Sequence, residues 1–308
     1  MYRYYIIILS DGTPLLRYNR PMLSSLEHSI LQTVCYADVF DFTLTPHEIF
    51  RFLITNKHYQ LGDITSAIAH ISELRIHNGF VYLRGRKKLV ELRKNLRHIS
   101  TQKMKEAHAA AKLLRWIPMI SAMFVTGGLA VGNIHDDDDI DFMIVTKPGW
   151  LWTTRCCVVC VSSLFGRYRF RSTMHVKNHW CFNLWLDETV LTISSLYRNI
   201  YTAHEVVQAK SVLDRSNITQ RFLAANTWVK TFLANATDWE IMKNATQTSK
   251  NIGAVNPIEI CCYALQQWHM RRIRTRERIG LLFAFFHPRD TSGIVMKKFK
   301  ERMKAYEA

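Results

Sequence analysis

The stretch FVTGGLAVGNIHDDDDIDFMIVT, residues 124–146, contains two short apolar runs separated by a glycine turn and an acidic segment. The first run begins at Met123, and the second, residues 142–145, is rich in β-branched and large side chains. Both runs are predicted to be buried strands. Because successive strand residues point to opposite faces, Asp139 and Asp141 should project the same way, with Ile140 in the core.

Two neighbouring carboxylates on one strand face repel each other unless a cation lies between them. Oxygen ligands of this kind suit Mg²⁺, which completes its shell with waters and substrate phosphates. The structural alternative is an acidic surface turn, residues 136–139, between two hairpin strands. Asp141 favours the functional interpretation, because it lies inside an apolar run where a solvated loop would not need it.

The order Gly127-Gly128, a spacer, then Asp139-Ile140-Asp141 resembles the signature of the polymerase-β-type nucleotidyltransferase superfamily. That signature is a strand, a Gly-Gly or Gly-Ser turn that opens a short helix, and an Asp-x-Asp pair on the next strand. The resemblance implies that Gly127 and Gly128 lie against the phosphates of a nucleotide, and that Asp139 and Asp141 bind the catalytic metals. It also implies Mg²⁺-dependent transfer of a nucleotide from a nucleoside triphosphate to an acceptor.

A third strand is predicted in HWCFNLWLD, residues 179–187. The superfamily usually adds a third carboxylate from this strand, as general base or as a further metal ligand. Asn183 occupies the middle of the strand, and a carboxamide is a very poor base. Asp187, at the end of the strand, is the alternative if the strand is offset. We therefore expect Asp139, Asp141 and Asp187 as catalytic residues, while Asn183 leaves open a domain that binds nucleotide and turns over weakly.

The amino-acid composition favours anionic binding partners but does not identify one class of them. Among 308 residues, 41 are Lys or Arg and 25 are Asp or Glu, a formal net charge of +16 that favours nucleic acid, nucleotides or an anionic membrane face. The seven cysteines show no repeated CxxC spacing, so we expect small buried side chains in a reducing cytoplasm.

Two apolar segments bear on targeting. The apolar run near the start is too short for a signal peptide. The most apolar stretch, Leu151 to Phe165, is shorter than the ~20 residues that a spanning helix needs, and it contains Arg155. We predict a buried helix, no transmembrane segment and a cytoplasmic protein.

Residues 1–22 are expected to be a leader or an edge segment, and residues 23–98 resemble a winged helix. In the second helix Thr45 is the predicted N-cap, with Pro46 at the first helical position and Glu48 closing a capping box. The third helix carries little positive charge, so packing or partner binding is expected there rather than sequence-specific DNA recognition. The pattern predicts helices over 26–39, 46–54 and 64–74, a turn at 78–79, a strand over 80–83 and a basic segment over 84–88.

Residues 99–200 are the expected nucleotidyltransferase-type domain, and residues 201–308 are expected to be helical. A long helix over 89–114 should link the N-terminal domain to it. Arg167, Arg169 and Arg171 alternate with aromatic residues, so a strand would place them on one face. Such a face would bind phosphates, or it would protect a sheet edge from aggregation.

These observations predict an α+β fold with a winged-helix-like domain, a central mixed sheet with helices, and a helical C-terminal region. The predicted function is Mg²⁺-dependent nucleotidyl transfer to a hydroxyl of a protein, an RNA or a small molecule. The rival function is a regulator that binds nucleic acid or a partner, built on a catalytically weak nucleotidyltransferase-like domain.

Overall fold

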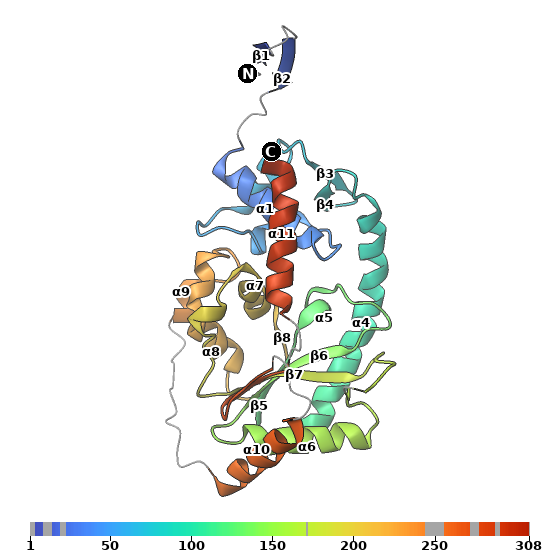
Figure 1. Ribbon diagram of the computed structural model, residues 1–308, viewed down its shortest axis with the longest axis vertical. Helices are drawn as coiled ribbons and strands as arrows, with labels where there is room; N and C mark the ends of the chain where they lie inside the picture. Colours follow the sequence, from blue (N-terminus) through green and yellow to red (C-terminus); the bar gives the residue numbers. More distant parts are fainter. Residues whose placement is uncertain are drawn as a thin grey trace.

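The fold is built on one mixed β-sheet with helices on both faces (Figure 1). The computed structural model describes residues 4–8, 14–18, 23–170, 172–243, 256–271, 277–286 and 290–307. The first two of these segments form an antiparallel pair, β1 (Tyr4–Ile8) and β2 (Pro14–Tyr18). The α+β class expected from the sequence is confirmed.

The central sheet has the strand order β8-β5-β6-β7-β10-β9. Strands β6 and β7 are parallel, and the remaining neighbours are antiparallel. The parallel pair is joined by a helical crossover, as parallel strands require. The strands are β5 (Ile120–Val125), β6 (Ile140–Thr146), β7 (Trp180–Asp187), β8 (Lys210–Asp214), β9 (Arg278–Ile279) and β10 (Phe283–Phe285).

The period-two alternation of the strands divides the apolar residues between two hydrophobic clusters. Phe124, Met143 and Val145 belong to the cluster that also contains the N-terminal helices. Met123 and Ile144 belong to the cluster on the opposite face. Asp141 shares the parity of Met143 and Val145, so it projects toward the side of the sheet that the N-terminal region covers.

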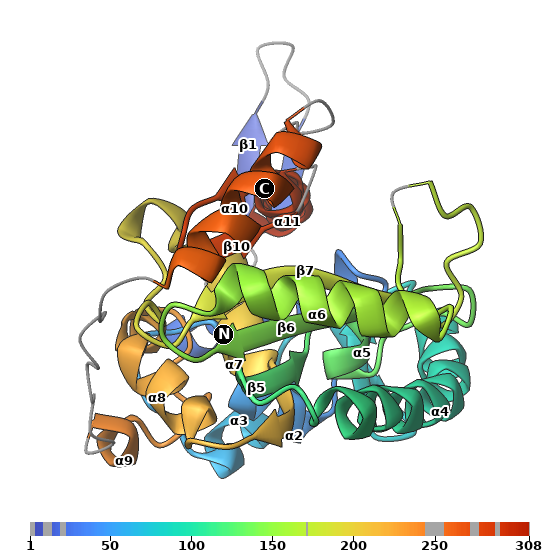
Figure 2. The same ribbon diagram turned by 90° about the horizontal axis from the view of Figure 1, so that it is seen from below.

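One face of the sheet is covered by α4 (Lys88–Leu114) and α6 (Leu151–Leu164), and α10 (Pro257–Met270) packs against α6 (Figure 2). Trp152 is fully buried there, and its backbone N–H donates to Glu259 at 2.6 Å. The helix predicted at Leu151 to Phe165 is therefore observed over Leu151–Leu164, with one face buried and with Leu164 and Phe165 exposed at its end. Within the described segments, no helix is long and apolar enough to cross a membrane.

The other face is covered by N-terminal and C-terminal helices together. These are α1 (Ser25–Asp38), α2 (Pro46–Arg51), α3 (Leu61–Ile68), α7 (Ile200–Gln208), α8 (Ile218–Ala225) and α11 (Thr291–Glu307). The predicted capping box of α2 is present: the Thr45 hydroxyl accepts from the Glu48 N–H at 3.2 Å, and Glu48 accepts from the Thr45 N–H at 2.8 Å. These helices and the sheet share one hydrophobic cluster.

The helix predicted over 64–74 is wrong in its second half. Helix α3 ends at Ile68, and β3 (Leu74–His77) pairs with β4 (Phe80–Leu83) as an antiparallel hairpin. Asn78 and Gly79 both have positive φ, 51° and 77°. Two such residues make the tight turn that matches the twist of a hairpin, so the Asn-Gly pair joins two strands here.

The prediction that the C-terminal region, residues 201–308, is helical is also wrong in part. Strands β8, β9 and β10 come from this region and complete the sheet on both sides of β5, β6 and β7. They are two to five residues long, too short to show a clear alternation in the sequence. The remaining elements are η1 (Ser195–Tyr197), η2 (Thr227–Thr231) and α9 (Trp239–Lys243).

Candidate functional site

The glycine turn and the two aspartates meet at one end of the sheet. Strand β5 leads through Thr126 into the short helix α5 (Gly127–Val131), and the chain returns at Asp139 to enter β6. The Thr126 N–H donates to the Asp141 carbonyl at 3.0 Å, which holds the turn beside the acidic strand. Ligand atoms of Asp139, Asp141 and Cys181 all lie within 4.8 Å of one another. The structure thus brings together the two aspartates that the alternation placed on one face.

Both glycines of the turn are required by packing. Gly127 has φ +61°, and a Cβ on it would lie 2.9 Å from Asp141 Oδ2. A Cβ on Gly128 would lie 2.4 Å from the Asn133 carbonyl oxygen, closer than carbon and oxygen approach. The geometry of the turn therefore explains glycine at these positions without a bound phosphate. The absence of side chains also leaves the backbone of the turn accessible from the cavity.

Burial and like charge act together on Asp141. They raise its pKa to about 7, burial first and the neighbouring Asp139 second. The Asn183 side-chain amide donates to Asp141 Oδ1 at 2.6 Å and fixes that carboxylate. Asn183 is 8% exposed, and its Oδ1 is buried with no hydrogen-bond partner in the described part of the chain.

A guanidinium lies where a cation is expected. Arg169 Nη1 donates to Asp139 Oδ2 at 2.6 Å and approaches Cys181 Sγ at 3.6 Å. Arg167 Nη2 lies instead 3.6 Å from Glu106 Oε2, so Arg167 and Arg169 interact with different partners. The predicted strand is reduced here to a single bridge between Tyr168 and Trp180, and Arg171 is outside the described residues.

The acidic run that precedes β6 divides into separate roles. Asp136 pairs with Lys177 at 2.6 Å, and Asp138 accepts the His135 N–H at 2.8 Å. Of the run, Asp139 joins Asp141 in the cavity. The surface-turn interpretation therefore holds for the first part of the run and not for its end.

Asp187 does not belong to this site, which corrects its prediction as a catalytic residue. In the β6–β7 register Asp141 faces Cys181, whereas Asp187 faces Thr146. Along β7, Asp187 lies six residues beyond Cys181, which at roughly 3.3 Å per residue is about 20 Å from the strand position beside Asp141. The Asp187 carboxylate accepts from the Gly149 N–H at 2.7 Å and the Thr189 N–H at 3.0 Å, so it stabilises the turn at the far end of the sheet.

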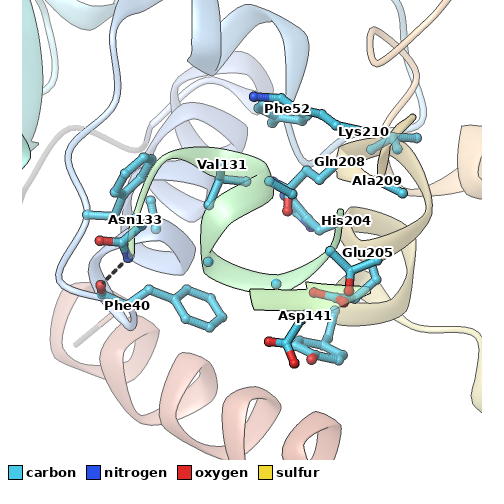
Figure 3. A pocket seen from close by; sticks show the side chains of 18 of the residues that line it. Phe40, Phe52, Val131, Asn133, Asp141, His204, Glu205, Gln208, Ala209 and Lys210 are labelled. Atoms are coloured by element: carbon cyan, nitrogen blue, oxygen red, sulfur yellow. Dashed lines mark hydrogen bonds between the residues drawn. The ribbon is translucent and has the colours of Figure 1, made fainter. Parts of the chain in front are cut away.

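A carboxylate that the sequence analysis missed lies in the same cavity. Glu205, on α7, lines it together with Asp141, and Figure 3 shows both side chains on the same side of the cavity. Burial raises the pKa of Glu205 to about 7. It forms no hydrogen bond or ion pair with the residues that the structure describes. The sequence held a signal, since Glu205 is flanked by His204, Val206 and Val207, whose side chains are buried, much as Asp141 interrupts an apolar strand.

Helix α7 packs against the N-terminal region through His204. His204 Nδ1 bonds the Ile200 carbonyl at 2.8 Å, and its ring stacks on Tyr36 with 4.2 Å between centroids. Burial lowers the pKa of His204 to about 4, so the imidazole is neutral at physiological pH. It serves as a packing group that aims the next residue, Glu205, into the cavity.

The cavity has a volume of about 760 Å³ and lies between the sheet and the N-terminal helices. Pockets of ~300–1,000 Å³ accommodate nucleotide-sized ligands. Its lining combines the acidic cluster with aromatic side chains and cations from α1, α2, β8 and the loop residues beside α1 and α2: Tyr36, Phe40, Phe42, His47, Arg51, Phe52 and Lys210. In the view of Figure 3, Phe52 and Lys210 lie at the end away from Asp141.

We compared the chain with models of protein families, with curated proteins and with solved structures, and none of the three comparisons found a match.

We expect Gly128→Ala to destabilise the fold by about 1–3 kcal/mol, because the added methyl group would meet the Asn133 carbonyl oxygen. Gly62→Ala is the matched control, since nothing lies within 4 Å of a Cβ there and α3 gains a better helix former. Urea unfolding followed by circular dichroism measures both. Equal stability of the two variants would contradict the packing explanation.

We expect Asp141→Asn to raise the melting temperature of the metal-free protein at pH 8 and to leave it nearly unchanged at pH 4. The folded protein keeps a proton on Asp141 up to about pH 7, whereas the unfolded chain releases it near the ordinary value of 3.8. Stability is therefore lost as pH rises from 4 to 7, by about 1–3 kcal/mol, and asparagine avoids that loss. Calorimetry at both pH values is the measurement. Asp136→Asn is the control, because Asp136 is exposed and paired with Lys177.

Proposed function

We propose that the chain is a Mg²⁺-dependent nucleotidyltransferase, which moves a nucleotide from a nucleoside triphosphate to an acceptor hydroxyl. The observation that carries the proposal is the convergence of Asp139 and Asp141 beside the Gly127 turn, in a cavity of nucleotide size. The strand–turn–helix–strand order around them supports it, because this is the arrangement that the sequence motif implies.

The donor set fits a hard divalent cation. Asp139 and Asp141 offer carboxylate oxygens, the ligands that Mg²⁺ prefers. Cys181 is a poor ligand for it, and burial, followed by the charge of Asp141, raises the pKa of its thiol, so it stays protonated. Asp139 and Asp141 would therefore hold the metal, with Asn183 orienting Asp141. When bound, Mg²⁺ neutralises charge on the phosphate oxygens.

Glu205 is the group that would take the proton from the acceptor. In the transfer, the acceptor oxygen forms a bond to the α-phosphorus while the bond from that phosphorus to pyrophosphate breaks, and the hydroxyl proton goes to the Glu205 carboxylate. A base works best when its pKa lies near the working pH, and that of Glu205 is about 7. The Asn183 amide cannot accept this proton.

Arg169 would take a second role once the metal occupies the Asp pair. In the metal-free protein it neutralises Asp139. A planar guanidinium also matches the spacing of phosphate oxygens, so displacement from Asp139 leaves it available to the substrate.

The second candidate function is a regulator that binds nucleotide without transferring it. Asn183 in the middle of β7 favours it, because the carboxylate usual in the superfamily is replaced there by an amide. The two candidates share the metal and nucleotide site and differ in turnover.

We expect Mg·ATP to bind the wild-type protein and to bind the double variant Asp139→Asn, Asp141→Asn at least about tenfold more weakly, because the metal loses both charged ligands. Asp136→Asn, in the same acidic run but paired with Lys177, should bind as the wild type does. Isothermal titration calorimetry measures the affinities, and circular dichroism checks the fold. Undiminished binding by the double variant would defeat both candidate functions.

We expect Glu205→Gln to reduce pyrophosphate release by about 10²–10⁴-fold while Mg·ATP affinity changes little, since a general base acts on the chemical step. Asp187→Asn is the comparison, because it removes an acid outside the cavity and should lower stability without removing transfer. The assay follows labelled nucleoside triphosphates with deproteinised small-molecule extract, total RNA or protein as acceptor. A wild type that binds Mg·ATP and releases no pyrophosphate with any acceptor would favour the regulator.

A further inference from the structure

Two cations, Arg51 and Lys210, line the cavity, and Lys210 lies at the end away from Asp141 (Figure 3). Arg51 ends α2, Arg93 lies on α4, and Lys210 begins β8. Burial lowers the pKa of Lys210 most, and the charges of Arg51 and Arg93 lower it further. Glu48 is the carboxylate that acts on Lys210 in the opposite direction.

Glu48 neutralises the third cation, Arg93. Its Oε1 accepts from Arg93 at 2.6 Å, and its Oε2 accepts the Thr45 N–H of the capping box. The Arg93 guanidinium also lies over the Phe42 ring, 3.7 Å from its centroid. Arg93 and Glu48 therefore form a packed structural pair.

Arg51 and Lys210 have no acidic partner comparable to Glu48 within the described ranges. Neither side chain forms a hydrogen bond or an ion pair with a residue in the described ranges, and both line the cavity. Both side chains are exposed to solvent at the wall of the cavity, and two cations on one cavity wall attract an anion.

The position of the two cations relates them to the metal site. In the sheet, Lys210 faces Val125 on β5, while β6 with Asp141 lies on the other side of β5. Two strand spacings of about 4.8 Å separate Lys210 from the level of Asp141, about 10 Å. Because Asp141, Arg51 and Lys210 all line one cavity, a substrate bound there can contact the Asp pair and the two cations.

We propose that Arg51 and Lys210 bind a phosphate group of the substrate, and that the N-terminal region thereby serves as one wall of the binding site. A guanidinium fork and an ammonium together match the charge and the oxygens of a phosphate. The proposal rests on the proposed function for the identity of the substrate. The phosphate comes from one of two sources: the terminal phosphates of the nucleoside triphosphate, or a phosphate carried by the acceptor.

The first arm of the test uses inorganic phosphate on the protein alone and so does not depend on nucleotide binding. ³¹P NMR titration should detect phosphate binding to the wild type and at least about a tenfold loss in the double variant Arg51→Gln, Lys210→Gln. Lys57→Gln with Lys112→Gln is the matched control, since it removes the same charge from exposed positions outside the cavity. Thermal melting checks that each variant folds. Equal phosphate binding by both double variants, or none by the wild type, overturns the proposal.

The second arm assigns the source by calorimetry with Mg·ATP and Mg·AMP. If the site takes the terminal phosphates, Arg51→Gln, Lys210→Gln weakens ATP at least about tenfold and leaves AMP unchanged. If it takes a phosphate on the acceptor, both nucleotides bind as in the wild type while the loss of inorganic phosphate remains. Failure of the wild type to bind either nucleotide would contradict the proposed function, and the phosphate titration would still decide the role of the two cations.

Discussion

Repulsion between two partly buried carboxylates is the constraint around which this molecule is arranged. Asp139 and Asp141 converge at the entry of β6, and the burial that raises the pKa of Asp141 also makes its ionised form costly. Two neighbouring side chains offset part of the cost of ionising the carboxylates. Arg169 supplies positive charge to Asp139, and Asn183 supplies a hydrogen bond to Asp141 where another acid would add repulsion. The further acid comes from a separate helix, as Glu205.

Local patterns in the sequence predicted the parts of the structure that local forces determine. Alternation around Ile140 put both aspartates on one face, and the spacing of Thr45 and Glu48 predicted a helix start. Long-range pairing was not visible. Asp187 failed as a site residue because the β6–β7 register places it opposite Thr146, and a register depends on contacts between distant segments. Glu205 was missed because only tertiary packing brings α7 to the aspartates.

The N-terminal helices and the central sheet share part of one hydrophobic core. Residues of α1, α2 and α3 share one hydrophobic cluster with β5, β6 and β7. The cavity lies along this junction, so its walls are fixed by the same packing that stabilises the fold. Any tilt of the N-terminal helices against the sheet would change the distance between the cationic and the acidic ends.

Helix α11 adds a consequence for biosynthesis. It packs against α1 and α7, its first residue, Thr291, lines the cavity, and Arg302 pairs with Asp38 on α1. Helix α1 leaves the ribosome well before α11, because more than 250 residues separate them in the sequence. Until α11 emerges, the nascent chain holds the aspartates without the helix that clamps α1 and α7. The cavity is therefore completed only after α11 has emerged, and a chain that stops before α11 carries the motif without a finished binding site.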